Sequence, residues 1–441
     1  MAIEVAKTRY GTARGKILKD YSLFLGIPFA KPPVGALRLR PPEPPEPWEG
    51  ERQPIRPNRA MQSDHGEGSF YYKEFYSDTS LTPPASEDCL YLNIWTPANS
   101  AEEKLPVMLW IHGGALIGGH GVELEFDGEA LCKKGVILVS INYRLGAFGY
   151  LAHPELTKES GSSGNFGLLD QVQALKFVYE NIKDFGGDPE KITIFGQSAG
   201  SMSVQALISS PLAKGMVAGA IMQSASGYKN GIMHAKSQAE VEEVGIQFLE
   251  KAGVKSIAEL RDLDSDQLLN ASSKFFMEYM MSGKGLPFAP CIDGYSLVAD
   301  YDEALETGIC HNVPCMIGSV ENDLGRGPES EGNLPIYDGC VNWSLESEKV
   351  FGKPSYVYFF SRKPLGDDAG AFHSVELWYM FGTLAKSWRP KEPEDYDLSE
   401  EMVSYWANFA KTGNPNGEGL AEWKPCVEAL PFVKTFDVKK C

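Results

Sequence analysis

The stretch KITIFGQSAGSMSVQALISS, residues 191–210, decides the fold of this chain. It begins with a short apolar run that is typical of a buried strand, and it continues from Ser198 as a helix. Between the two lies a GxSxG pattern, which is weak evidence alone but is strong where a strand enters it and a helix leaves it. The alternative is an ordinary glycine-rich turn. The context favours a tight turn that projects the Ser198 hydroxyl, with Gly196 and Gly200 avoiding clashes with neighbouring backbone.

Strand-like and helix-like segments alternate on both sides of this turn. Strands are expected within residues 90–97, 105–114, 135–144, 218–225, 312–319 and 355–361, and helices within 165–187, 198–210, 237–276 and 399–413. This alternation predicts an α/β fold with a mostly parallel sheet that is covered by helices on both faces. We find no repeat and no break in composition, so we expect one domain over residues 1–441 with a helical insertion at about 228–290.

The charge of the chain excludes some classes of partner. It has 41 Lys and Arg against 59 Asp and Glu, a formal net charge of −18 over 441 residues. That balance argues against binding nucleic acid through its phosphates, and against docking on an anionic membrane. No apolar run is long enough to span a bilayer, so we expect no membrane insertion.

The eight cysteines do not form a disulfide or metal pattern. The chain contains no CxxC motif and no set of Cys and His with the spacing of zinc ligands. We therefore expect reduced thiols and no metal or organic cofactor. The N-terminus lacks the apolar core of an export signal, so a cytoplasmic location is expected unless a leader was removed.

A serine hydroxyl becomes a nucleophile only when a base takes its proton, and chain order helps to find that base. In the α/β-hydrolase layout the order is Ser, then acid, then His. Three histidines follow Ser198. His234 opens the helical insertion and His311 precedes a strand, whereas His373 follows the last long loop. His373 is therefore the candidate base.

The acid should lie on a loop after a strand, between the serine and the histidine. The strand that ends near Ser319 is followed by Glu321 and Asp323. Position alone does not separate these two carboxylates.

An oxyanion-binding loop is expected where His112-Gly113-Gly114-Ala115 follows a predicted strand. Glycines let backbone N–H groups approach a carbonyl oxygen closely, and the N–H of Ala199 would complete the set. His112 precedes Ser198 in the chain, so we expect it to orient the loop rather than to act as the base.

These segments together resemble the type-B carboxylesterases, the family of the cholinesterases and of bacterial para-nitrobenzyl esterases. FGGDPEKITIFGQSAG (185–200) is similar to the serine signature of the family, and EDCLYLNIWTP (87–97) is similar to its second signature. GIPFAKPPVGALRLRPPEP, NYRLGAFGYL, GNFGLLDQ and YWANFAKTGNPN are also similar to family segments. The resemblance covers nearly the whole chain and implies the α/β-hydrolase fold.

The resemblance also implies residue roles. The nucleophile would be Ser198 and the base His373. The acid would be Asp323, five residues after Gly318, where the family usually has Glu, and Glu321 is the minor alternative. The oxyanion donors would be the N–H groups of Gly114, Ala115 and Ala199.

Supporting residues follow from the same resemblance. Ser224 matches a serine that hydrogen-bonds the acid of the triad, and Arg40 and Glu87 match a structural ion pair. Gln197 stands beside the nucleophile where the family usually has Glu. Cys89 lacks the upstream cysteine with which it pairs in secreted members.

The cover of the site is expected to differ from that of longer relatives. The segment from Asp323 to His373 is short, so a shortened cap is expected at about 325–372. The aromatic residues within 70–76 either line the entrance or form a packed surface loop. Acyl-pocket residues are expected near 281–288.

The resulting prediction is a serine hydrolase that cleaves small-molecule carboxylic esters through an acyl-enzyme. One alternative is an acyltransferase that uses the same acyl-enzyme, and another is a non-catalytic adhesion or binding protein. The natural ester is not encoded in any motif, and a monomer is favoured.

Overall fold

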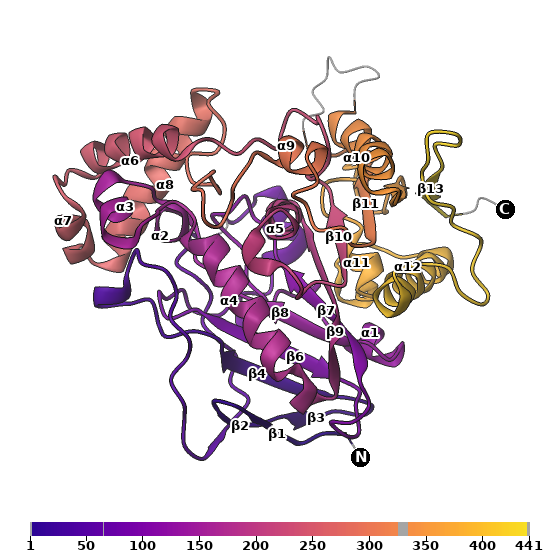
Figure 1. Ribbon diagram of the computed structural model, residues 1–441. Helices are drawn as coiled ribbons and strands as arrows, with labels where there is room; N and C mark the ends of the chain where they lie inside the picture. Colours follow the sequence, from indigo (N-terminus) through magenta and orange to yellow (C-terminus); the bar gives the residue numbers. More distant parts are fainter. Residues whose placement is uncertain (1, 65, 325–333, 439–441) are drawn as a thin grey trace.

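A ten-stranded mixed sheet forms the centre of the molecule, in the order β13-β12-β11-β10-β9-β7-β8-β6-β4-β3 (Figure 1). The computed structural model describes residues 2–64, 66–324 and 334–438. The strands of this sheet are β3 (Lys16–Ile17), β4 (Ser22–Pro28), β6 (Tyr91–Thr96), β7 (Leu105–Ile111), β8 (Ile137–Ile141), β9 (Gly187–Gln197), β10 (Gly219–Gln223), β11 (Cys315–Val320), β12 (Tyr356–Phe360) and β13 (Val433–Phe436). The predicted strands are all present.

The strands from β7 to β13 pair in parallel with one another. Strands β3, β4 and β6 are antiparallel to their neighbours. In the middle of the sheet Leu109 of β7 stands opposite Val139 of β8 and Ile194 of β9. The N-terminal strands β1 (Val5–Thr8), β2 (Gly11–Arg14) and β5 (Glu51–Arg52) form a separate small sheet. Parallel pairing brings the carboxyl ends of β7, β9 and β11 to one edge, which is where ligands bind in such sheets.

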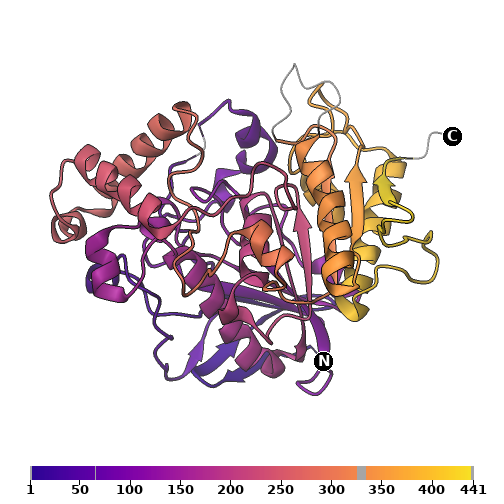
Figure 2. The ribbon, with the colours of Figure 1, turned by 45° about the horizontal axis from the view of Figure 1, so that its top comes forward.

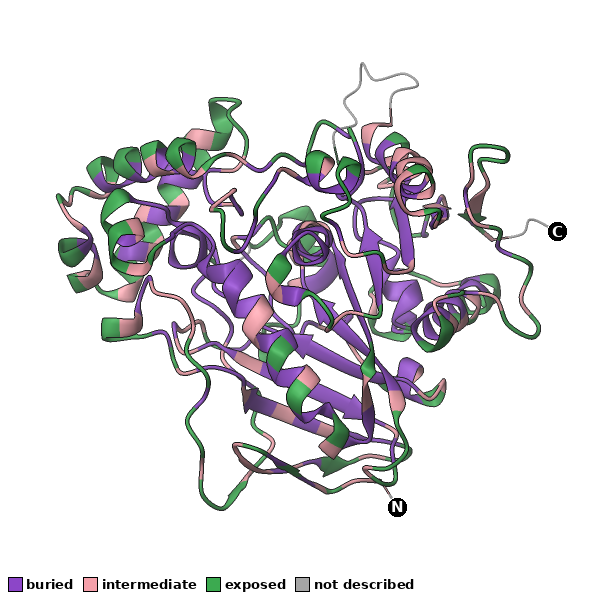
Figure 3. Cartoon of the chain, viewed as in Figure 1, coloured by how far each residue is buried: buried purple, intermediate pink, exposed green. Residues whose placement is uncertain are grey.

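Alternating side chains of the central strands pack on two faces. From β7, Leu109 and Ile111 join the core that contains α4 and α5, whereas Met108 and Trp110 join the core that contains α11 and α12. Figure 3 shows these strands as buried along most of their length. The helices are α1 (Glu129–Lys133), α2 (Gly146–Tyr150), α3 (Pro154–Ser160), α4 (Phe166–Asn181), α5 (Ala199–Ile208), α6 (Gln238–Ala252), α7 (Ile257–Asp262), α8 (Ser265–Met281), α9 (Tyr301–Glu306), α10 (Pro335–Phe351), α11 (Leu377–Met380) and α12 (Pro393–Thr412).

Three helices, α6 to α8, occupy the span in which a helical insertion is expected, and they lie at one end of the molecule (Figure 2). Two of them start at capping boxes, in which Ser237 pairs with Glu240 and Asp264 with Gln267. Helix α10 is not among the predicted elements, although it buries Trp343. The expected shortened cap begins in residues 325–333, which lie outside the described residues.

The expected ion pair between Arg40 and Glu87 is wrong by two residues. Arg38 donates from Nε to Glu87 Oε2 at 2.7 Å, and both side chains are buried. Arg40 instead pairs with Glu159 on α3. Between the two arginines, Leu39 is fully buried at a positive φ of 57°. The chain therefore bends at Leu39, and the two guanidinium groups point to different partners.

The cysteines of the described chain all carry free thiols, and all are buried. Burial raises the pKa of the Cys89 thiol well above its usual range. Cys441 lies outside the described residues. Within the residues that the structure describes, no helix has the length and apolar character needed to cross a bilayer.

Candidate active site

Ser198 lies at a sharp turn between β9 and α5, as the sequence predicts. Its backbone has φ 56° and ψ −126°, a conformation that non-glycine residues adopt only where the surroundings force it. The neighbouring chain leaves no room for side chains on the flanking glycines. A Cβ on Gly200 would lie 2.0 Å from the carbonyl oxygen of Ile111, and one on Gly196 would lie 2.5 Å from the backbone of Gly200. The strain is therefore held by the packing of β7 against this turn.

The glycine loop after β7 lies directly against this serine. A Cβ on Gly113 would meet the backbone oxygen of Gln197 at 2.7 Å and Cβ of Ser198 at 3.1 Å. Gly114 and Ala115 have φ of 101° and 53°. Within the described part of the chain, the N–H groups of these two residues donate no hydrogen bond to protein.

The N–H of Ala199 lies on the other side of the serine. Ala199 is the first residue of α5, and the N–H groups in the first turn of a helix have no intrahelical partner. Three backbone donors are thus available around the Ser198 side chain, in a region where the helix dipole favours negative charge.

His112 is packed under the loop. Its ring stacks on Tyr143 with 4.5 Å between the ring centroids, and the Tyr143 hydroxyl donates to the His112 carbonyl oxygen at 2.9 Å. Burial lowers the pKa of His112 to about 4. The ring is therefore neutral at pH 7, and its contacts are those of a residue that holds the loop in place.

The structure brings Asp323 and His373 together. Oδ1 of Asp323 lies 2.6 Å from Nδ1 of His373, and both side chains are more than nine-tenths buried. Oδ2 of Asp323 accepts a hydrogen bond from the N–H of Val320 at 3.2 Å. Glu321 points elsewhere, because its carboxylate pairs with Lys363 at 2.9 Å. Sequence position leaves Asp323 and Glu321 equivalent, and the geometry distinguishes them because Asp323 alone of the two contacts His373.

The second ring nitrogen of His373 contacts Gln197. The two Nε2 atoms are 3.2 Å apart, and among the described residues His373 makes no hydrogen bond to Ser198. An amide N–H that faces Nε2 and a carboxylate that faces Nδ1 both favour the tautomer with its proton on Nδ1. In resting enzymes the bond between nucleophile and base is often long and tightens only when substrate binds.

Ser224 does not make the contact expected of it. It is buried at a positive φ of 54°, and its hydroxyl has no hydrogen-bond partner among the described residues. Its backbone N–H donates to the carbonyl oxygen of Gly318 at 2.8 Å. Ser224 therefore joins the ends of β10 and β11 through its backbone, because the positive φ fixes its position in the turn.

Glu376 is a buried acid near the site that the sequence analysis missed. Its Oε1 accepts a hydrogen bond from Gln223 Nε2 at 3.4 Å. Burial, and next the charge of Asp323, raises the pKa of Glu376 to about 7. No motif marks this residue, and only its position three residues after His373 could have drawn attention to it.

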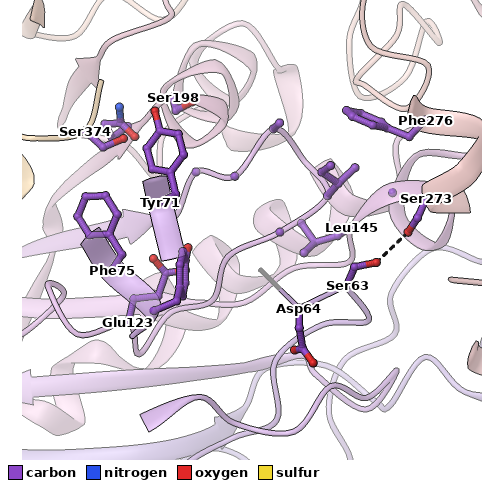
Figure 4. A pocket seen from close by; sticks show the side chains of 18 of the residues that line it. Ser63, Asp64, Tyr71, Phe75, Glu123, Leu145, Ser198, Ser273, Phe276 and Ser374 are labelled. Carbon is purple, nitrogen blue, oxygen red and sulfur yellow. Dashed lines mark hydrogen bonds between the residues drawn. The ribbon is translucent and has the colours of Figure 1, made fainter. Parts of the chain in front are cut away.

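A cavity of about 490 Å³ opens in front of these groups. Its lining includes Ser198, His373, the glycine loop and the aromatic side chains Tyr71, Phe75 and Tyr76. In Figure 4, Tyr71 and Phe75 lie on one side of the cavity and Phe276 lies on the opposite side. The aromatic segment thus contributes to the cavity wall, which was one of its two expected roles.

The opposite wall comes from α8, and it differs from the expected acyl pocket. Leu269, Ser273 and Phe276 line the cavity, and the hydroxyl oxygens of Ser273 and Ser63 are 3.1 Å apart. Residues 281–288 do not contribute to it, and Met281 is 84% exposed. The lining residues stand one to three helical turns earlier, because the cavity faces the middle of α8 rather than its end.

A sequence model of the carboxylesterase family matches residues 3–329 and 335–441. The chain belongs to the carboxylesterase family. It is 40% identical to a fumonisin B1 esterase of Sphingopyxis macrogoltabida, over 98% of this chain and 86% of the relative. It is 33% identical to a para-nitrobenzyl esterase of Bacillus subtilis, over 95% of this chain and 92% of the relative.

Solved structures of carboxylesterases share its fold. A thermophilic para-nitrobenzyl esterase superposes with a TM-score of 0.86 at 30% identity, covering 99% of this chain and 96% of that one. A carboxylesterase of Geobacillus stearothermophilus gives a TM-score of 0.82 at 31% identity, with the same coverage. The chain therefore has the α/β-hydrolase fold and is a carboxylic-ester hydrolase. Among the described residues, no group of three or more His, Cys, Asp or Glu could hold a metal ion.

Proposed function

We propose that this carboxylesterase cleaves small-molecule esters through an acyl-enzyme formed on Ser198. Nε2 of His373 takes the proton of the Ser198 hydroxyl as its oxygen attacks the ester carbonyl. Asp323 holds the imidazole in the required tautomer and stabilises the imidazolium that forms. The N–H groups of Gly114, Ala115 and Ala199 bind the oxyanion of the tetrahedral intermediate.

The second half of the reaction reverses these proton transfers. His373 gives its proton to the leaving alcohol, and the acyl group stays on Ser198. Water then enters, and His373 takes one of its protons as the water oxygen attacks the acyl carbonyl. His373 returns that proton to the Ser198 oxygen as the carboxylic acid leaves. Each step uses one base and one oxyanion site, so no further group is needed.

The contact between Asp323 and His373 is the observation that carries this proposal. Its 2.6 Å distance is that of a strong, charge-assisted hydrogen bond, and it fixes the imidazole of His373, which lines the same cavity as Ser198. The strained backbone of Ser198 and the N–H groups of Gly114 and Ala115, which have no protein acceptor among the described residues, support the same reaction, because the glycine loop packs against Ser198 at Gly113.

Covalent labelling tests the nucleophile directly. A phosphonate ester that reacts with activated serines is expected to add one adduct per chain, and peptide mass spectrometry should place it on Ser198. The physical reason is that the proposed mechanism places a base and an oxyanion site beside this hydroxyl. Ser203 on α5, whose hydroxyl donates to the carbonyl oxygen of Ala199 at 2.9 Å, is an internal control that should stay unmodified. An adduct elsewhere, with full loss of esterase activity, would contradict the proposal.

Acyl transfer is the second candidate function, since an alcohol could replace water at the acyl-enzyme. Product analysis with an added acceptor alcohol separates the two. Carboxylic acid as the main product at millimolar acceptor supports hydrolysis, whereas predominant formation of a new ester would support the transferase.

The size of the cavity predicts tolerance of bulky alcohol groups. A space of about 490 Å³ is large enough for an aryl or branched alcohol, and its walls are mainly apolar. Among acetate esters, kcat/KM is expected to be on the order of tenfold higher for benzyl than for methyl alcohol, because each buried apolar group adds binding energy. Activity should persist for tert-butyl acetate. A series of esters at fixed acyl group measures this, and activity restricted to methyl and ethyl esters would show that the cavity is closed during turnover.

A further inference from the structure

Two acidic residues on the segment between the glycine loop and α1 line the same cavity as Ser198. Glu123 and Glu125 are 9% and 1% exposed, yet both contribute to the cavity wall. Figure 4 shows Glu123 on the side of the cavity that carries Phe75. The proposed mechanism uses neither carboxyl group.

The first carboxyl group of the pair is held by protein donors. Oε1 of Glu123 accepts hydrogen bonds from the Tyr76 hydroxyl at 3.0 Å and from the N–H of His120 at 2.8 Å. The second carboxyl group, of Glu125, is hydrogen-bonded to that of Glu123, but its Oε2 atom is buried and has no hydrogen-bond partner among the described residues. A buried acceptor without a partner costs free energy, so such an atom indicates that its partner comes from outside the chain.

The nearest cationic side chains are engaged elsewhere. Arg59 pairs with Asp64 and donates from Nε to the carbonyl oxygen of Pro83 at 2.9 Å. Lys386 pairs with Asp127 at 2.6 Å. Within the described residues, neither carboxyl of the pair forms a salt bridge with these cations, and the two carboxyls are hydrogen-bonded to each other.

The surroundings of the pair suit a cation with an organic tail. Tyr71 stacks on Phe75 with 6.3 Å between ring centroids, and Phe75 stacks on Trp378 at 5.4 Å. Phe126, next to Glu125 in the chain, also lines the cavity. Aromatic faces pack against methylene groups and attract positive charge.

We propose that Glu123 and Glu125 form a subsite that binds a protonated primary or secondary amine of the substrate, with an N–H of the ammonium donating to this carboxyl pair. The substrate class would be esters that carry such an amine. This inference rests on the proposed function, since the amine would belong to an ester that is cleaved at Ser198 in the same cavity. Recognition by N–H donation distinguishes it from an aromatic site for quaternary ammonium, which has no N–H to donate.

The subsite should depend on pH. Burial raises the pKa of both carboxyl groups. Each carboxyl faces the other, and a hydrogen bond joins the two; Tyr76 and the N–H of His120 also face Glu123, and Arg59 and Lys386 act at longer range. At low pH the pair is protonated and offers no charge to an ammonium. Amine affinity is therefore expected to rise as pH increases from 6 to 8, where an alkylamine is still protonated.

Binding of three matched ligands tests the proposal without using catalysis. Isothermal titration calorimetry would compare phenethylammonium, 2-phenylethanol and phenethyltrimethylammonium at pH 8. The expected result is that phenethylammonium binds on the order of tenfold or more tightly than either of the others, because a hydrogen bond to a charged group adds that much. Equal binding of the alcohol, or tighter binding of the trimethylammonium compound, would overturn the proposal.

Two variants test whether the preference for the ammonium ligand depends on Glu125. In Glu125→Gln the preference for phenethylammonium over 2-phenylethanol should fall to near unity, whereas the matched control Glu129→Gln, an exposed acid on α1, should keep it. If Glu125→Gln does not fold, the pH dependence of amine affinity in the unmodified protein tests the proposal instead. An affinity that stays constant or falls from pH 6 to 8 would overturn the proposed subsite. Because calorimetry needs no turnover, a failure here leaves the Ser198 mechanism untouched, and the reverse also holds.

Discussion

Replacing Ser198 with alanine is expected to lower kcat for p-nitrophenyl acetate by on the order of a millionfold, with the fold unchanged. The hydroxyl is the only atom lost, and in the proposed mechanism no neighbouring group can form the acyl-enzyme in its place. The strained φ of 56° at this position is tolerated by alanine about as poorly as by serine, so the packing that holds the turn should hold the variant too.

The matched control for this experiment is Ser203→Ala. This serine is fully inside α5, five residues further along the chain, and lies outside the cavity lining. Circular dichroism and thermal unfolding would establish that both variants are folded. A Ser198→Ala protein that keeps near wild-type turnover, while folded, would exclude Ser198 as the nucleophile.

Changing Asp323 to asparagine is expected to lower kcat by roughly ten-thousandfold, with little change in KM. An amide can occupy the same space as the carboxylate, yet it can present an N–H to Nδ1 of His373 and thus favour the wrong tautomer. It also removes the negative charge that stabilises the imidazolium. The effect should therefore fall on the chemical step and not on substrate binding.

Glu321→Gln is the paired control for Asp323→Asn. Its carboxylate contacts Lys363, and a partly exposed ion pair contributes only ~0–1 kcal/mol to the free energy of unfolding. Steady-state kinetics on both variants should show a loss in kcat for Asp323→Asn alone. A larger loss of kcat for Glu321→Gln would show that Glu321, and not Asp323, is the acid.

Much of the fold follows from local pattern. Short apolar runs such as residues 105–111 and 137–141 become β7 and β8 because a strand buried on both faces needs apolar side chains throughout. Helix α10 escapes prediction because its apolar residues, including Trp343, are separated by polar ones that also pack inside, such as Ser344 and Ser347. Local periodicity does not show burial of that kind.

The residues of the candidate site were also predictable from the sequence only in part. Sequence order alone selects Ser198 and His373, because few residues of the right type stand in the right succession. It leaves Glu321 and Asp323 equivalent, since both follow β11 within three residues of its end. Only the folded loop, which directs Asp323 to His373 and Glu321 to Lys363, separates them.

The sequence by itself determined the strands from β6 to β12, the strand–turn–helix at Ser198 and the glycine loop, because these depend on residues that are close together in the chain. The tertiary structure alone decided that Arg38 rather than Arg40 pairs with Glu87, and that Glu123 and Glu125 face a cavity instead of solvent. The two residues lie in a segment of turns, in which the Phe126 N–H donates to the carbonyl oxygen of Glu123, and a pair of acids two residues apart is equally common on exposed surfaces. Whether a charge is buried depends on segments far apart in the sequence, here the aromatic residues near Phe75 and the helix α11, and no local pattern contains that information.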